Sequence, residues 1–203
     1  MMNKKFFMFG IAIFTGFLMG CSTTKVERLK VEEVVDLSGR WNDTDAQMVS
    51  REMIGNCLVA AWLDSFVKQT GREPVVIVGT IENNSSEHIN SAVFIKSLER
   101  DMINSGKVKF VASKPERPEV RDERKSQNEE GYSDPATIKP PRKEVGADFM
   151  LRGSINTVTD NASGKYVILY QVNLELVDLT TNEVKWLEQT ELKKLVKKSK
   201  YSL

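Results

Sequence analysis

The stretch from Pro74 to Gly106 constrains the fold more than any other part of the chain. Its pattern predicts a buried strand, a polar loop and an amphipathic helix. The strand contains four consecutive β-branched residues, Val75–Val78, which is typical of a strand covered on both faces. Such a strand needs a layer of structure on each side, and the rest of the chain must supply those layers.

The helix of this stretch is indicated by apolar residues at spacings of three and four. Its expected inner face is formed by Ile89, Val93, Phe94, Leu98 and Met102. Asn104-Ser105-Gly106 ends it, and a second strand follows at 108–112. The two strands fit a parallel crossover, although their local pattern leaves an antiparallel pairing open.

The loop between strand and helix is rich in hydrogen-bonding side chains and lies at the carboxyl end of a strand, where α/β proteins often bind ligands. Its candidate protein-binding residues are Asn84, Ser85, Glu87 and His88. The plainer interpretation is that Asn84, Ser85 and Ser86 satisfy backbone groups and cap the next helix. On that interpretation, replacing Glu87 and His88 together with Ala leaves folding nearly intact.

One long helix is predicted before this stretch, over about residues 44–70. Asp43, Thr44 and Asp45 offer N-cap side chains, and Gly71 closes the helix. Cys57 falls on its apolar face, so we expect a buried thiol; a nucleophilic role would need a neighbouring base.

A highly charged segment from Pro115 to Glu130 predicts a solvated helix with ion pairs between successive turns. Arg117, Arg121 and Arg124 are candidate protein-binding residues, because they could gather on one side and meet an acidic partner. The proline-containing segment that follows is expected to be an exposed loop.

The carboxyl half alternates apolar and polar residues, which predicts three antiparallel strands with one solvated face. Leu151, Ile155 and Val158 are expected on the covered face of the first strand. A last strand is predicted over 184–192. The final basic residues, Lys193, Lys194, Lys197, Lys198 and Lys200, fit either a soluble helix terminus or contact with anionic lipid or wall polymer.

The amino terminus has the features of a lipoprotein signal peptide, residues 1–20. Lys4 and Lys5 precede an apolar run too short for the ~20 residues of a membrane-spanning helix. Gly20-Cys21 then fits a lipobox, so Cys21 is the predicted lipidation site and membrane anchor. Ser22 follows where inner-membrane retention favours Asp, which points to the outer membrane.

Residues 21–38 form a predicted tether, and residues 39–203 a single globular domain. The tether reaches at most about 55 to 60 Å when fully extended. Val31, Val34, Val35 and Leu37 could instead dock as an edge segment.

Composition and motifs exclude several classes of function. Loss of Lys4 and Lys5 with the signal peptide reduces the basic residues from 29 to 27, against 28 acidic ones. The mature chain therefore lacks the excess of positive charge that is typical of proteins that bind nucleic acid. His88 is the only histidine, which leaves no His and Cys set for zinc. The sequence has no Gly-x-Ser-x-Gly elbow. We therefore expect no enzyme, no metal and no cofactor.

Several long segments, taken together, resemble the LpoB family of outer-membrane lipoprotein activators of bifunctional penicillin-binding proteins. They are SGRWNDTDAQMVSREMI, GTIENNSSEHINSAVF, VRDERKSQ, GADFMLRGSI and YQVNLELVDLTTNEVKW. The resemblance runs from about Asp36 to Lys194. One departure is the short tether, where the best-known members carry a long proline-rich one.

The resemblance implies a mixed α/β (α+β) fold similar to the TolB amino-terminal domain: a small mixed sheet with flanking helices and an antiparallel meander in the carboxyl half. It also implies a non-catalytic protein of the periplasmic side of the outer membrane that activates a peptidoglycan synthase in cell-wall biogenesis. The alternative is an envelope scaffold that recognises a glycan, a lipid or another envelope protein.

Overall fold

A computed structural model of the chain describes residues 28, 30, 33, 35–36, 38–129, 131–162 and 165–197. The chain divides into two compact units, residues 1–33 and 34–203, and the helices and strands belong to the second. The predicted signal peptide, Cys21 and most of the predicted tether lie outside the described residues. So do Val31, Val34 and Leu37 of the alternative docked segment, and Lys198 and Lys200 of the basic end.

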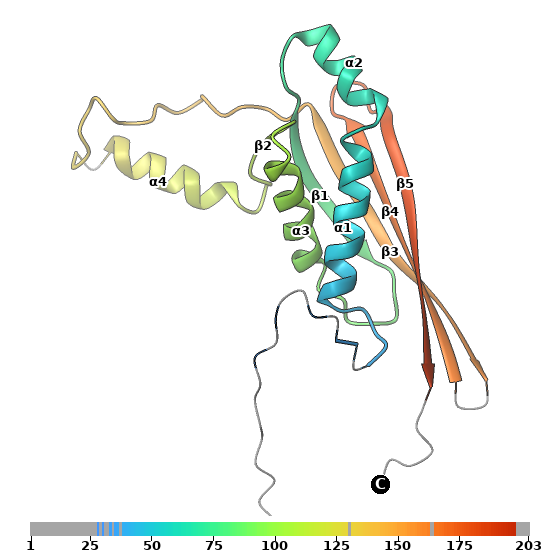
Figure 1. Cartoon of the computed structure of the whole chain (residues 1–203). Coiled ribbons are helices and arrows are strands. Elements are labelled where there is room, and N and C mark those ends of the chain that lie inside the picture. The colour runs from blue at the N-terminus through green and yellow to red at the C-terminus, as the bar shows by residue number, and fades with distance from the viewer. Residues whose placement is uncertain are drawn as a thin grey trace, which may run out of the picture. The chain divides into compact units, whose positions relative to one another are not determined.

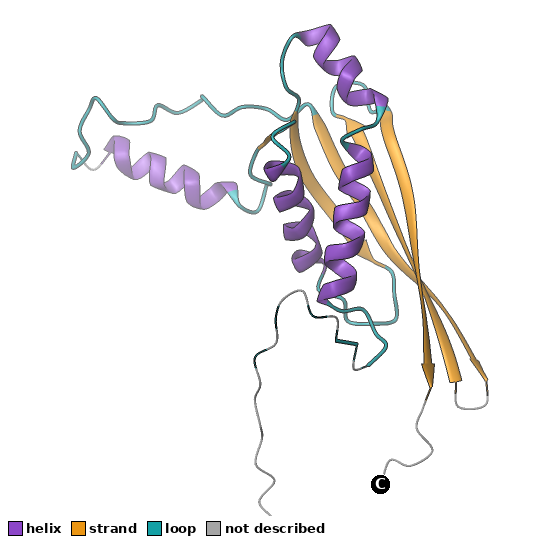
Figure 2. Ribbon diagram, viewed as in Figure 1, coloured by secondary structure: helices purple, strands orange, loops and turns teal. Residues whose placement is uncertain are grey.

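The second unit contains a five-stranded mixed sheet with helices, which confirms the mixed α/β class (Figures 1 and 2). Its strand order is β2-β1-β3-β4-β5. β1 pairs in parallel with both β2 and β3, whereas β3, β4 and β5 form the predicted antiparallel meander. The strands are β1 (Val75–Asn83), β2 (Lys109–Phe110), β3 (Phe149–Ala162), β4 (Lys165–Asp178) and β5 (Val184–Lys197).

β1 follows the prediction closely, but the strand predicted over residues 108–112 after the crossover is shorter, at Lys109–Phe110. Val75–Val78 are all buried, as expected for a strand covered on both faces. Helix α3 (Ser91–Asn104) connects β1 to β2, and the parallel pairing of Val75 with Lys109 settles the direction that the sequence left open.

Two details of α3 differ from the prediction. Its N-cap is Asn90, whose side chain accepts a hydrogen bond from Ala92 N at 3.1 Å, so the residues Asn84–Ser86 do not cap this helix. Val93 is 53% exposed, because the buried row is Phe94, Leu98 and Met102, four residues apart, and Val93 lies beside it.

The long helix predicted over residues 44–70 is two helices, α1 (Asp43–Cys57) and α2 (Ala61–Thr70). The break has a local cause: the Cys57 carbonyl accepts hydrogen bonds from Trp62 Nε1 at 2.7 Å and from Ala60 N at 3.3 Å. In a continuous helix that carbonyl would accept from Ala61 N instead. Gly71 ends α2 in the left-handed conformation, as predicted.

α1 and α3 pack side by side on one face of the sheet, which we call the inner face (Figure 2). The core lies between them. It is formed by buried residues of both helices and of alternating strand positions, among them Met53, Phe94, Leu98, Met102, Leu151, Ile155, Tyr170, Leu174 and Leu176. Cys57 is buried in this core, as the sequence predicted.

The opposite, outer face of the sheet is solvated over the β3–β5 meander, as expected from the alternation. β4 shows the pattern most clearly, with alternate residues from Ile168 to Leu176 buried. Val158 was expected on the covered face, but it is 66% exposed, because it shares the parity of Arg152 and Ser154 in β3. β5 extends beyond the predicted end at residue 192 to Lys197, so the described part of the basic end is strand.

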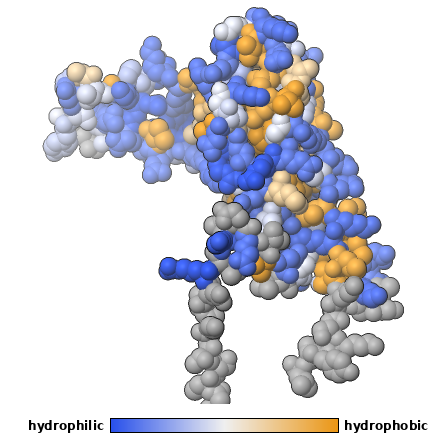
Figure 3. Space-filling view, viewed as in Figure 1, coloured by the Kyte–Doolittle hydropathy of each residue, from blue (hydrophilic) through white to orange (hydrophobic). Residues whose placement is uncertain are grey.

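Helix α4 (Arg117–Glu129) has no buried residues, in agreement with the predicted solvated helix. The segment 131–147 returns from α4 to β3 without helix or strand. Together, α4 and this return segment form a projection from the sheet that we call the arm (Figure 1). Its surface is mostly hydrophilic (Figure 3).

Candidate protein-binding surface

The loop after β1 places its candidate residues in different surroundings. Asn84 lies beside the outer face, where its Nδ2 donates to Asn156 Oδ1 at 3.1 Å and its backbone N donates to the Ile155 carbonyl at 2.9 Å. The Ser85 hydroxyl donates to Asn83 Oδ1 at 2.6 Å, so Ser85 stabilises the turn itself. His88 is exposed.

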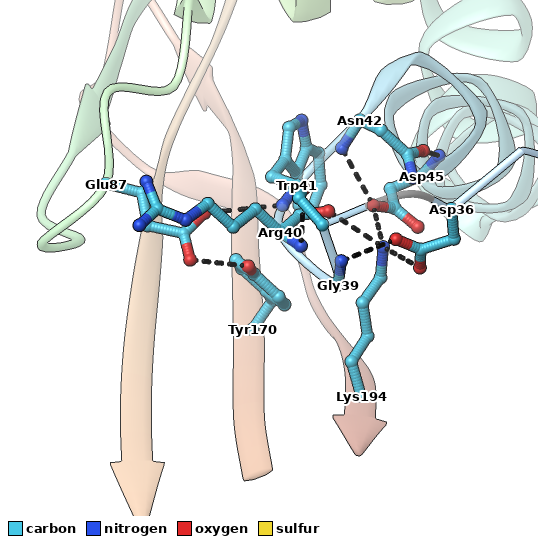
Figure 4. Close-up of polar contacts among 10 residues, drawn as sticks. Asp36, Gly39, Arg40, Trp41, Asn42, Asp45, Glu87, Tyr170 and Lys194 are labelled. Carbon is cyan, nitrogen blue, oxygen red and sulfur yellow. Dashed lines mark hydrogen bonds and ion pairs between the residues drawn. The ribbon is translucent and has the colours of Figure 1, made fainter. Parts of the chain in front are cut away.

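Glu87 turns toward the inner face. Its Oε1 accepts a hydrogen bond from the Tyr170 hydroxyl at 2.8 Å and its Oε2 accepts one from Trp41 N at 3.3 Å (Figure 4). Tyr170 is fully buried in the core. Burial and the Glu87 carboxylate together raise the pKa of Tyr170. Glu87 therefore holds a buried hydroxyl and the chain before α1, which argues against the expectation that its loss leaves folding intact.

Lys194 also makes contacts within the folded unit, so it is not part of a free basic tail. Its Nζ donates to Asp45 Oδ2 at 2.6 Å, to Asp36 Oδ2 at 2.9 Å and to the Arg40 carbonyl at 2.9 Å (Figure 4). Gly39, with a φ of 68°, lies so close to Val196 that a Cβ there would be 2.1 Å from a valine methyl. The segment before α1 is thus fixed against the end of β5.

Two of the three candidate arginines of α4, Arg121 and Arg124, pair with one carboxylate, and Arg117 is not among its hydrogen-bond partners. Arg121 donates to both Glu144 oxygens, with distances of 2.9 and 2.7 Å, and Arg124 Nη1 lies 3.0 Å from Glu144 Oε1. Hydrogen bonds from Arg121 and then Arg124 lower the pKa of Glu144 to about 2. Asn128 Nδ2 also donates to the Lys139 carbonyl at 3.0 Å. These contacts hold the return segment against α4.

A cavity of about 420 Å³ lies at the root of the arm, and we call it the root pocket. It is bounded by α4, by the end of the return segment and by the outer face of the sheet. Arg117 lines it, and the buried Nε of Arg117 has no hydrogen-bond partner among the described residues. Its other lining residues are Ile77, Val111, Ala112, Val120, Arg124, Glu144, Val145, Gly146, Ala147, Met150 and Leu179.

A second hollow, of about 640 Å³, lies on the outer face of β1, β3, β4 and β5. Its walls are more polar than those of the root pocket, and they include an ion pair between Arg152 Nε on β3 and Glu175 Oε1 on β4, 2.5 Å apart. Met150 lines both cavities, and it fits there because Gly79 leaves room; a Cβ at Gly79 would be 2.8 Å from the Met150 sulfur. The two cavities therefore adjoin at Met150.

Sequence reasoning found the arginines of this surface but missed its apolar part. Val120, Val145, Met150 and Leu179 come from four separate segments, so no local pattern unites them. Val120 gave the one available signal, because it is the single large aliphatic residue of the charged segment. A lone valine there is more economically explained as incidental surface, since isolated exposed apolar residues are common.

The described residues include no group of three or more His, Cys, Asp or Glu side chains that could hold a metal ion. Within the same residues, no helix has the length and apolar character needed to cross a membrane. The exposed surface at the root of the arm combines an apolar pocket with paired charges, which suits the binding of another molecule.

A protein-family profile described as "Peptidoglycan-synthase activator LpoB" matches residues 45–192. The chain belongs to the LpoB family. The LpoB match covers nearly all of the second unit from α1 into β5, and it includes the arm, the root pocket and the outer face.

Solved structures also show similarity to this chain. The LpoB carboxyl-terminal domain from Escherichia coli has 17% identity and a TM-score of 0.36, covering 76% of this chain and 99% of that one. The NMR structure of E. coli LpoB has 14% identity and a TM-score of 0.39, covering 89% and 87%. Lipoprotein GNA1162 from Neisseria meningitidis has 13% identity and a TM-score of 0.37, covering 63% and 87%. A search of curated proteins gave no significant match.

Proposed function

We propose that this protein is a non-catalytic envelope lipoprotein that binds and activates a bifunctional penicillin-binding protein in peptidoglycan synthesis. The observation that carries the proposal is the match of residues 45–192 to the LpoB family of peptidoglycan-synthase activators. Acylated Cys21 anchors it to the outer membrane, with the folded unit on the periplasmic side. In this arrangement, the folded unit recognises the synthase.

The proposed docking surface is the outer face together with the arm. Among the candidate residues, Asn84 and His88 contribute at the edge of the sheet, and Arg117, Arg121 and Arg124 contribute from α4. Glu87 and Ser85 act indirectly, because their polar atoms are used within the protein. Activation requires this surface to bind the active conformation of the synthase more tightly than the inactive one.

The short tether limits where the partner can lie. A fully extended tether brings the folded unit within about 55 to 60 Å of its own membrane. Docking therefore requires either a synthase with a tall ectodomain or a narrow periplasm.

Site-specific photo-crosslinking in the native envelope tests the proposal. A photoreactive residue at position 120, on α4, is expected to trap a penicillin-binding protein. The matched control is position 93 on α3, because Val93 and Val120 are both 53% exposed. Capture from position 120 but not 93 supports the proposal, whereas capture of no synthase from either position, or equal capture from both, contradicts it.

A further inference from the structure

We propose that the root pocket binds an extended peptide segment of the partner protein, with aliphatic side chains entering the pocket and carboxylates flanking them. The inference rests on the proposed function for the source of the peptide, which is the synthase.

The walls of the root pocket are apolar and open to solvent. Val120, Val145 and Leu179 are 53%, 63% and 43% exposed, and all three line this one cavity. Exposed apolar residues scattered singly need no explanation, but several gathered in a concave site are typical of a binding pocket. The volume of about 420 Å³ lies in the range of ligand pockets and has room for aliphatic side chains.

The backbone beside the pocket favours a peptide over a lipid. Residues 145–147 have no helix or strand structure, and all three of them, Val145, Gly146 and Ala147, line the pocket. Among the described residues, none forms a hydrogen bond with the backbone of these three. Unpaired N–H and C=O groups beside an apolar pocket suit an extended peptide, whose own backbone can pair with them while alternate side chains enter the pocket. An acyl chain would leave those groups without protein partners.

The charges around the pocket favour carboxylates on that peptide. Arg117 and Arg124 line the root pocket, and an adjacent cavity of about 340 Å³ adds Arg121, Lys125 and Arg142. The acidic residues lining the two cavities are Glu144, which already pairs with two arginines, and Glu129. Lys125 pairs with Glu129, whereas Arg117 and Arg142 form no ion pair with a described residue, so carboxylates of the peptide would pair with these two guanidinium groups.

The test uses the full chain held in lipid nanodiscs and a fluorescein-labelled peptide of about twelve residues that alternates valine or leucine with glutamate. Two further peptides serve as probes: one with lysine in place of every glutamate, and one with N-methyl groups on alternate backbone nitrogens. Binding is measured by fluorescence anisotropy. Val120→Asp places a carboxylate in the pocket, and Val93→Asp is the control, because it makes the same change at an equally exposed helical position.

The acidic peptide is expected to bind about tenfold or more tightly than the lysine peptide, and to lose that affinity with Val120→Asp but not with Val93→Asp. The N-methylated peptide is expected to bind more weakly than its parent. Equal binding of all three peptides, equal effects of the two variants, or displacement of the acidic peptide by dodecanoate at comparable concentration would each overturn the proposal.

This outcome is separate from that of the proposed function. If position 120 traps a synthase while the acidic peptide fails to bind, then the activator proposal stands and the peptide chemistry is wrong. If the peptide binds while no synthase is trapped, then the pocket is a peptide site that serves another partner.

Discussion

Lys194 Nζ lies 2.6 Å from Asp45 Oδ2, and the two residues are separated by 149 positions in the sequence. Both side chains are at most 10% exposed. Burial lowers the pKa of Lys194, but hydrogen bonds to Asp45 and Asp36 outweigh it and leave the pKa raised. This ion pair joins the start of α1 to the end of β5, so the segment that follows the tether is fixed to the sheet at that point.

Replacing Lys194 with methionine should destabilise the fold, because it leaves Asp45 buried without its partner. We expect a loss of about 3 kcal/mol, measured by urea unfolding near neutral pH. Lys193→Met is the matched control, since Lys193 is the exposed neighbour on the same strand and its replacement should change stability by no more than about 0.5 kcal/mol. Equal effects of the two variants would show that the ion pair adds nothing to stability.

The same ion pair makes stability depend on pH, because the pKa of Lys194 is raised in the folded protein. Its contribution to the free energy of unfolding should be complete at neutral pH. That contribution should fade only as the pH rises above the ordinary lysine pKa near 10.4.

The Glu87 carboxylate should be required for stability, and the neighbouring His88 should not. Glu87→Ala removes the acceptor of the Tyr170 hydroxyl and of Trp41 N, so we expect a loss of about 2 kcal/mol in thermal or urea unfolding. His88→Ala, at an exposed position of the same loop, should stay within about 0.5 kcal/mol of the wild type. An unchanged unfolding midpoint for Glu87→Ala would mean that solvent replaces both hydrogen bonds without cost.

Glu144 should hold the arm together over a wide range of pH. Its pKa is lowered to about 2, so its contribution is complete above its ordinary value near 4.5 and is lost as pH falls through about 2. Hydrogen exchange of α4 amides at pH 4 should therefore still show protection in the wild type and less protection in Glu144→Gln. Glu119→Gln, on the same helix, is the control. Equal protection in all three proteins would exclude a role for the arginine pairs.

Thiol labelling should distinguish the two cysteines of the chain. Burial raises the pKa of Cys57 to about 12, which lowers its thiolate fraction at pH 8 by roughly a thousandfold relative to an ordinary cysteine. Cys57 should therefore react with an alkylating reagent only after denaturation. If Cys21 carries lipid, the denatured protein from its native envelope should label once per chain, as counted by mass spectrometry. Two labels per chain would contradict lipidation.

The sequence predicted the parts of the fold that depend on local pattern. Residues adjacent in the sequence are enough to predict a buried strand from the β-branched run Val75–Val78, and a half-buried strand from the alternation of β4. The burial of both strands confirms these predictions. The break between α1 and α2 was missed, because it depends on where the Trp62 side chain donates its hydrogen bond. Apolar spacing alone continues through that break without interruption.

The candidate surface was harder to predict, because its residues meet only in three dimensions. The arginines of α4 were visible as a cluster, but Glu144, the common partner of Arg121 and Arg124, is 20 or more positions away. Glu87 and Lys194 were expected in exposed polar segments, and both instead contact residues more than 40 positions distant. Long-range pairing of this kind leaves no trace in residue type or spacing.

Reconstitution with a bifunctional penicillin-binding protein tests the central claim most directly. Glycan polymerisation from labelled lipid-linked precursor is measured with the synthase alone, with the full chain added, and with the Val120→Asp and Val93→Asp variants added. We predict that the wild type and Val93→Asp raise the rate of polymerisation and that Val120→Asp does so much less. An unchanged rate with the wild-type protein, under conditions where the synthase is active, would contradict the assignment of this chain as an activator.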